Sequence, residues 1–235
     1  MKPVWLIAGN FLREQRWPIL ILLGWVGLLL AAAGFSDLRR APEDVFMLFQ
    51  QVAVYILVFS LFFGASAIRN ELRTRRILAV LSKGISRRQY ITGLLLGIVI
   101  AILTYCLALG GVGAWVLPQA GVPASRLWFL LLGLLAASLL TACLALFFSI
   151  FLHPLLATGA TVLIVGAPLL AQALWKSNWA AAIPVYAILQ GFFNLSQIGT
   201  APAGWLILLA LGETALLWLG SAWLFSWKDV ALAVE

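Results

Sequence analysis

The sequence has 235 residues, of which 64% are hydrophobic and only 10% are charged, and its mean hydropathy is +1.07. Soluble domains carry about 25% charged residues, so this composition excludes a soluble globular protein and indicates an integral membrane protein. At about 20 residues per span, the chain accommodates about six transmembrane helices and leaves no room for a soluble catalytic domain. The net charge of +7 comes from basic residues beside apolar runs. We therefore expect contacts with membrane lipids and none with nucleic acid.

The first residues of the chain predict an amphipathic helix ahead of the first span. Apolar residues recur at helical spacing, and the polar and basic ones fall mainly on the opposite side. The apolar set is Val4, Ile7, Ala8, Phe11 and Leu12, and the polar set is Lys2, Asn10, Arg13 and Arg16. Such a helix lies in the membrane interface rather than across it, so we expect an N-terminal elbow helix.

Six apolar runs are long enough to cross a bilayer, and together they form a single transmembrane domain over residues 1–235. The predicted spans are residues 18–36, 45–68, 88–117, 126–151, 154–175 and 203–226. The connection between spans five and six is too polar for a span and too apolar for a free loop. We expect short helices there, on the outer face of the membrane.

The distribution of Lys and Arg predicts the orientation of the spans. Six spans place both termini on one side, together with the loops after spans two and four. That side holds eleven basic residues, which are Lys2, Arg13, Arg16, Arg69, Arg73, Arg75, Arg76, Lys83, Arg87, Arg88 and Lys228. The other side holds four, which are Arg39, Arg40, Arg126 and Lys176. The richer side is expected to face the cytoplasm, so both termini and the loop between spans two and three are cytoplasmic.

The loop between spans two and three begins as a basic helix. Arg69, Arg73 and Arg76 have the i, i+4, i+7 spacing that forms one stripe, and Glu71 and Arg75 form an i, i+4 pair. The second span is therefore predicted to continue as a helix beyond the membrane.

Residues 84–90 then predict a sharp corner. Gly84 accepts the positive φ that ends a helix, and Ser86 with Gln89 forms an S-x-x-Q capping box that starts the next one. Ile85 and Tyr90 are placed as a hydrophobic staple across that start. Two interpretations stay open: positive charge that only sets topology and binds lipid headgroups, or a rigid docking element for a cytoplasmic partner.

The stretch "LAVLSKGISRRQY" resembles the loop between the second and third spans of type-2 ATP-binding-cassette (ABC) permeases. The N-terminal "FLREQRW", the "LALFFSIF" of span four and the C-terminal "AWLFSWKDVAL" are also similar to that family. The matching loop positions are Glu71, Arg75, Leu81, Ser82, Lys83, Ile85, Ser86, Arg87, Tyr90, Gly93 and Gly97. The chain departs from the family at Arg76, where Thr is usual, at Gly84, where Pro is usual, and at Leu94, where Lys is usual.

This resemblance implies the permease subunit of an exporter in the plasma (inner) membrane of a bacterium or archaeon. Its loop would be the coupling helix that docks on a separate ATPase. Two ATPase copies, carrying ATP and Mg, would act with this chain and a second permease chain, identical or related. The cargo would be amphipathic. The implied coupling residues are Arg69, Glu71, Arg73, Arg75, Arg76, Lys83, Gly84, Ile85, Ser86, Arg87 and Arg88.

The chain itself has no phosphate-binding motif. A G-x-x-x-x-G-K-[ST] loop is required, but the only Lys that precedes Ser or Thr is Lys176, which follows Trp175. We therefore expect no enzymatic activity, no catalytic residue, no metal site and no cofactor on this chain.

Glu213 is the one carboxylate well inside a predicted span. A charge at the bilayer centre costs about 2.5–3.5 kcal/mol on insertion scales, so an acid there is a functional candidate. It would face the translocation path or the dimer interface. The alternative is a packing residue, hydrogen-bonded near Thr104, Ser138 or Thr141.

Two other functions remain as alternatives. A proton-coupled secondary transporter would use Glu213, and a membrane assembly subunit would not transport at all. An intramembrane enzyme is disfavoured, because Glu213 and the single histidine, His153, fall on different spans at different depths.

Overall fold

The computed structural model describes residues 2–35, 42–73, 84–116, 118, 124–175 and 204–227. These residues contain seven α-helices and no strand, so the predicted all-α class is confirmed. The helices are α1 (Lys2–Glu14), α2 (Arg16–Phe35), α3 (Pro42–Arg73), α5 (Arg87–Val116), α6 (Ala124–Ser149), α7 (Pro154–Trp175) and α9 (Gly204–Trp227).

A helix occupies each of the six predicted spans. The bounds agree within two residues, except for α3, which is longer at both ends. Four stretches of the described residues have the length and apolar composition of a membrane span, and they lie in α3, α5, α6 and α9: Gln51–Arg69, Arg87–Val116, Leu127–Ser149 and Gly204–Trp227. The chain is therefore a membrane protein. Shorter apolar stretches lie in α2 and α7, and their crossing of the membrane stays a prediction.

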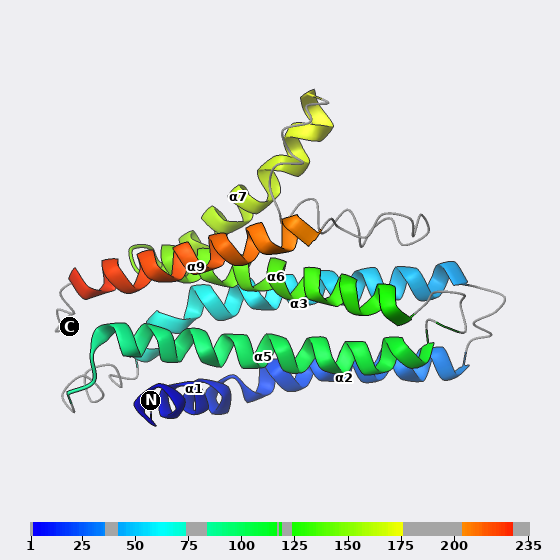
Figure 1. Ribbon diagram of the computed structural model, residues 1–235, viewed down its shortest axis with the longest axis horizontal. Coiled ribbons are helices and arrows are strands. Elements are labelled where there is room, and N and C mark those ends of the chain that lie inside the picture. Colours follow the sequence, from blue (N-terminus) through cyan, green and yellow to red (C-terminus); the bar gives the residue numbers. More distant parts are fainter. Residues whose placement is uncertain are drawn as a thin grey trace.

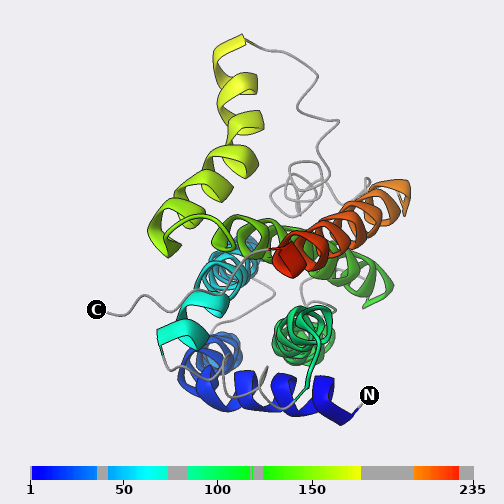
Figure 2. The same cartoon turned by 90° about the vertical axis from the view of Figure 1, so that its left-hand side faces the viewer.

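Most of the long helices lie roughly parallel or antiparallel to one axis. Several segments that are distant in sequence come together at one end of the bundle. At the left of Figure 1 lie α1, the C-terminal ends of α3 and α9, and the N-terminal end of α5. The predicted cytoplasmic side gathers the same segments. Helix α7 diverges from the bundle at its far end (Figures 1 and 2).

Helix α1 lies across the bundle. Figure 2 shows it along its length, whereas α2 and α5 are seen almost end on. Ile7, Ala8 and Phe11 are buried, and Trp5 and Leu6 on the same helix are 60% and 69% exposed. An apolar helix that packs on one side and exposes large apolar side chains on the other has the geometry of an interfacial helix.

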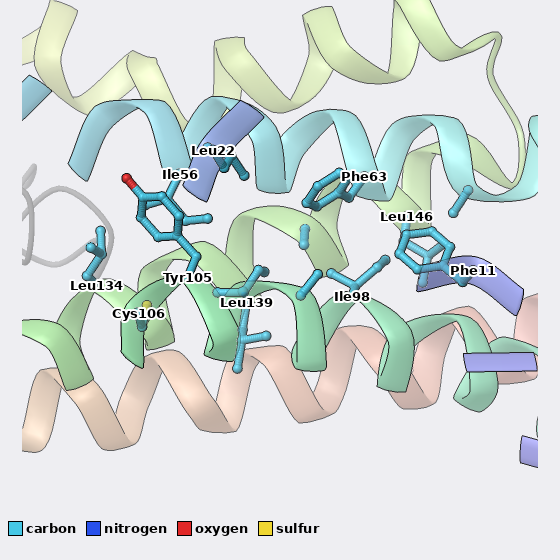
Figure 3. Packing of buried hydrophobic residues seen from close by; sticks show 14 of the residues in the cluster. Phe11, Leu22, Ile56, Phe63, Ile98, Tyr105, Cys106, Leu134, Leu139 and Leu146 are labelled. Atoms are coloured by element: carbon cyan, nitrogen blue, oxygen red, sulfur yellow. The ribbon is translucent and has the colours of Figure 1, made fainter. Parts of the chain in front are cut away.

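Helix α6 is the central element, because it packs against α3, α5, α7 and α9. It is the most buried of the four span-length helices, and α9 is the least buried. Side chains of α1, α2, α3, α5 and α6 interlock along the core shown in Figure 3. The hydroxyl of Tyr105 on α5 donates a buried hydrogen bond of 2.8 Å to the carbonyl of Val52 on α3, which fixes these two helices relative to each other.

A close backbone contact joins α3 to α6. A Cβ atom added at Gly64 would overlap the carbonyl oxygen of Ala142 and would lie 2.9 Å from the Cβ of Ala145. Only glycine therefore allows the two backbones to approach this closely.

The predicted outer-face helices between spans five and six fall in residues 176–203, which lie outside the described part of the chain.

Replacing Gly64 by Ala is expected to destabilise the protein. The new methyl group has to displace the α6 backbone, and overpacking of this kind costs roughly 1–3 kcal/mol. Thermal unfolding of the purified protein in detergent measures the change.

Gly27→Ala is the matched control, because a Cβ at Gly27 on α2 meets nothing within 4 Å. This variant should unfold at or above the wild-type temperature. Equal melting temperatures for the two variants would show that the close contact contributes nothing to stability.

Candidate functional site: the corner between α3 and α5

The basic stripe begins at the end of α3. This helix is described as far as Arg73, four residues past the span-length apolar stretch that ends at Arg69. Arg69 is exposed. Glu71 and Arg73 lie within the helix. Arg75, Arg76 and Lys83 fall outside the described residues, so the full stripe and the Glu71–Arg75 pair stay predictions.

The start of α5 has the capping geometry that the sequence predicts. Gly84 has a φ of +77°, in the left-handed region that favours glycine. The Gln89 amide N–H donates to Oγ of Ser86 at 3.3 Å, and the Ser86 amide N–H donates to Oε1 of Gln89 at 3.2 Å. This reciprocal pair is a capping box, and the prediction is confirmed. Proline, with φ fixed near −65°, could not take the conformation of Gly84.

Apolar side chains fix the corner to the bundle. Tyr90 is 1% exposed, and the half-buried Ile85 packs against the same core cluster. The two residues predicted as a hydrophobic staple therefore both anchor the turn in the core.

The corner is also attached to the C-terminal end of α9, which the sequence did not reveal. The guanidinium of Arg87 donates to the carbonyl of Ser226 at 3.3 Å. The ring of Tyr90 stacks on Phe225, with centroids 6.3 Å apart and planes 19° apart. Arg87 thus serves one of the unpaired carbonyls in the last turn of α9, where a cation is also favoured by the helix dipole.

Helix α1 packs on α5 immediately after the corner, through two glycines. A Cβ at Gly93 would lie 2.7 Å from the Cβ of Ile7, and a Cβ at Gly97 would lie 2.8 Å from the ring of Phe11. The partner of both glycines is α1. The corner, α1 and the end of α9 thus form one packed unit.

The chemistry of this site suits docking. Arg88 is exposed, and Ser86 and Gly84 are exposed beside it. The described residues contain no group of three or more His, Cys, Asp or Glu side chains that could hold a metal ion. The corner thus combines an exposed cation with a buried apolar anchor.

Glu213 lies apart from the corner, near the middle of α9. It is half-buried and lines a cavity of about 330 Å³ between α6, α7 and α9. The other lining residues are apolar: Leu140, Leu144, Ile164, Val165, Leu216 and Leu217.

The expected hydroxyl partners of Glu213 do not line this cavity. The Thr104 and Thr141 hydroxyls each donate at 2.8 Å to a carbonyl of their own helix, Ile100 and Ala137 respectively. Oγ of Ser138 is buried without a hydrogen-bond partner in the described structure. The packing-residue interpretation stays a prediction.

His153 has a structural role at the turn before α7. Its Nδ1 atom accepts a hydrogen bond from the Leu155 amide N–H at 3.3 Å, which satisfies one of the free donors of that helix start. The exposed ring of His153 caps the start of α7, whereas Glu213 lies in α9.

No protein-family model matches this chain, and no curated protein shows significant similarity to it. The resemblance to type-2 ABC permeases therefore rests on the loop residues themselves.

Replacing Ser86 by Ala is expected to loosen the start of α5. Loss of an N-cap costs about 1 kcal/mol, so hydrogen exchange at the Gln89 amide should be roughly fivefold faster. Mass-spectrometric exchange of the purified protein, read on the peptide that covers residues 84–92, measures this change.

Ser86→Asn should restore slow exchange, because Asn also caps helices. Ser66→Ala is the matched control, since Oγ of Ser66 bonds to the Phe62 carbonyl inside α3 and caps nothing. Slow exchange in Ser86→Ala would contradict a stabilising capping box.

Proposed function

We propose that this chain is the membrane-spanning permease subunit of an ABC exporter. It acts as a dimer with an identical or related permease chain and binds two copies of a cytoplasmic ATPase that carries ATP and Mg. The corner between α3 and α5 is the docking element, and an amphipathic substrate is exported or extracted from the bilayer. The host membrane is the plasma (inner) membrane of a bacterium or archaeon, with both termini in the cytoplasm.

The corner carries this proposal. Positive charge in a loop is enough to orient the membrane spans, and this role does not require the loop to have a fixed structure. Here Gly84, the capping box and the anchored Ile85 and Tyr90 produce a fixed turn next to the basic stripe. A fixed geometry is what a partner surface needs for recognition, because less conformational entropy is lost when a rigid element binds.

The attachments of the corner explain how docking would move the membrane domain. A push on residues 84–90 acts on α5 directly. It reaches α9 through the Arg87 hydrogen bond and the Tyr90 ring, and α1 through Gly93 and Gly97. Packed helices transmit such displacements because their contacts are close and not continuously deformable.

In the proposed cycle, ATP binding closes the ATPase pair and moves the two docking corners together. The connected helices then shift as units, and the path between the two permease chains changes its access. ATP hydrolysis reopens the ATPase pair and resets the corners. This chain contributes no chemical step.

A proton-coupled secondary transporter is the second candidate, because Glu213 is a carboxylic acid that opens on a cavity within the membrane domain. The two functions separate at the ATPase. A proton-driven carrier needs no cytoplasmic ATPase, whereas the exporter depends on one.

Reversing the charge of Arg69, Arg73 and Arg76 to Glu is expected to abolish co-purification of a cytoplasmic ATPase with the tagged chain from its native host. The change turns an attractive basic stripe into a repulsive one. Mass spectrometry of the purified complex, quantified against the permease, provides the readout.

The matched variant replaces the same three arginines by Gln. It leaves eight basic residues on the predicted cytoplasmic side against four on the other, so orientation should be preserved while the charge contacts are lost. Full ATPase retention in both triple variants would exclude the stripe as the docking element. No ATPase with the wild-type chain would instead favour the second candidate.

A further inference from the structure

The cavity at Glu213 is open to the surroundings of the bundle, since Leu216 and Ile164 in its lining are 70% and 45% exposed. One carboxyl group and six aliphatic side chains line about 330 Å³ between three helices. This volume is at the lower end of the range of small-molecule sites, about 300–1,000 Å³. A cavity of this size accommodates a short alkyl chain or a small ring system.

The described helices supply no cation to the carboxyl group. The lining residues contributed by α6 and α7 are Leu140, Leu144, Ile164 and Val165, none of which carries a charge. Glu213 is also the only charged residue of α9. An ionised carboxylate is costly in such surroundings unless a cation pairs with it, and none of the described lining residues supplies one.

Three threonine hydroxyl groups on these helices donate within their own helix, and none of the three residues lines the cavity. Thr214 on α9 donates to the Ala210 carbonyl at 2.7 Å, and Thr161 on α7 donates to the Ala157 carbonyl at 2.8 Å. Thr141 on α6 is bonded within its own helix in the same way. Among the described residues that line the cavity, only Glu213 has a polar side chain.

We infer that this cavity is a binding site for a lipophilic amine, whose cationic nitrogen pairs with the Glu213 carboxylate and whose apolar part fills the space among the aliphatic side chains. The inference rests on charge complementarity together with the apolar walls. A neutral lipid tail would fill the same walls and leave the carboxylate unpaired, and an anionic amphipath would be repelled.

This inference names the substrate class of the proposed exporter as cationic amphipaths. The claim that these amines are transported rests on the proposed function. Binding itself takes place on the permease chain and requires no ATPase. A failure of amine binding and a failure of ATPase docking are therefore separate experimental results.

The test uses three ligands with one alkyl chain and different head groups: octylamine, octanol and octanoate. Octylamine is cationic at pH 7, as the lysine amine is. Radiolabelled octylamine is bound to the purified full-length chain in detergent in a scintillation proximity assay, and each unlabelled ligand competes with it. Octylamine should compete at least about tenfold better than octanol, because a hydrogen-bonded charge pair adds more than a neutral contact.

Two variants distinguish charge from shape. Glu213→Gln preserves the size of the side chain and removes its charge, so the preference for octylamine over octanol should disappear. Leu144→Trp fills the cavity and should weaken both ligands. Glu14→Gln removes a carboxylate from α1, outside the cavity, and should leave the preference unchanged.

Equal competition by octylamine and octanol on the wild-type chain would overturn the inference, and the cavity would then hold a lipid tail or a second copy of the chain. An amine preference that survives in Glu213→Gln would overturn it as well. Melting temperatures of all variants, measured in the same detergent, show that each chain is folded when it is assayed.

Discussion

The structure depends on close approach of helix backbones at small residues. Lipid tails are as apolar as leucine side chains, so burial of apolar surface gives little drive for helices to associate within a bilayer, and packing contacts decide the arrangement. Gly64 against Ala142 and Ala145 joins α3 to the central α6, and Gly110 on α5 accepts the ring of Trp128 from α6. Around these contacts, the aliphatic core of α2, α3, α5 and α6 can interlock.

The same kind of packing makes the corner mechanically continuous with the rest of the domain. Its capping box is local, within residues 84–90, whereas the Arg87 hydrogen bond and the glycine contacts reach α9 and α1. Helix α9 then leads from Phe225 and Ser226 at one end of the bundle to Glu213 near its middle. One rigid helix thus connects the proposed ATPase-facing surface to the proposed ligand cavity, without an intervening loop.

Sequence reasoning succeeded where a local rule determines the structure. Bilayer thickness fixes the length of apolar runs, so the helix positions follow from hydropathy, and the Ser86–Gln89 cap depends on residues three apart. It failed for contacts between helices, because any apolar face can pack on any other. Ser226 and Phe225 carry no signal that pairs them with Arg87 and Tyr90. Hydropathy likewise does not show which side chains line the cavity at Glu213, and the expected Thr104, Ser138 and Thr141 are not among them.

The packing of α1 on α5 has a consequence for synthesis. Phe11 fits against Gly97, yet the ribosome makes that glycine more than eighty residues later, which takes about 4–16 s at about 5–20 residues per second. Throughout this interval α1 lacks its final partner, and its apolar face needs cover from lipid at the membrane surface. The amphipathic pattern of α1 therefore serves a nascent chain before it serves the finished one. Tight docking of α1 therefore has to wait until α5 has been made.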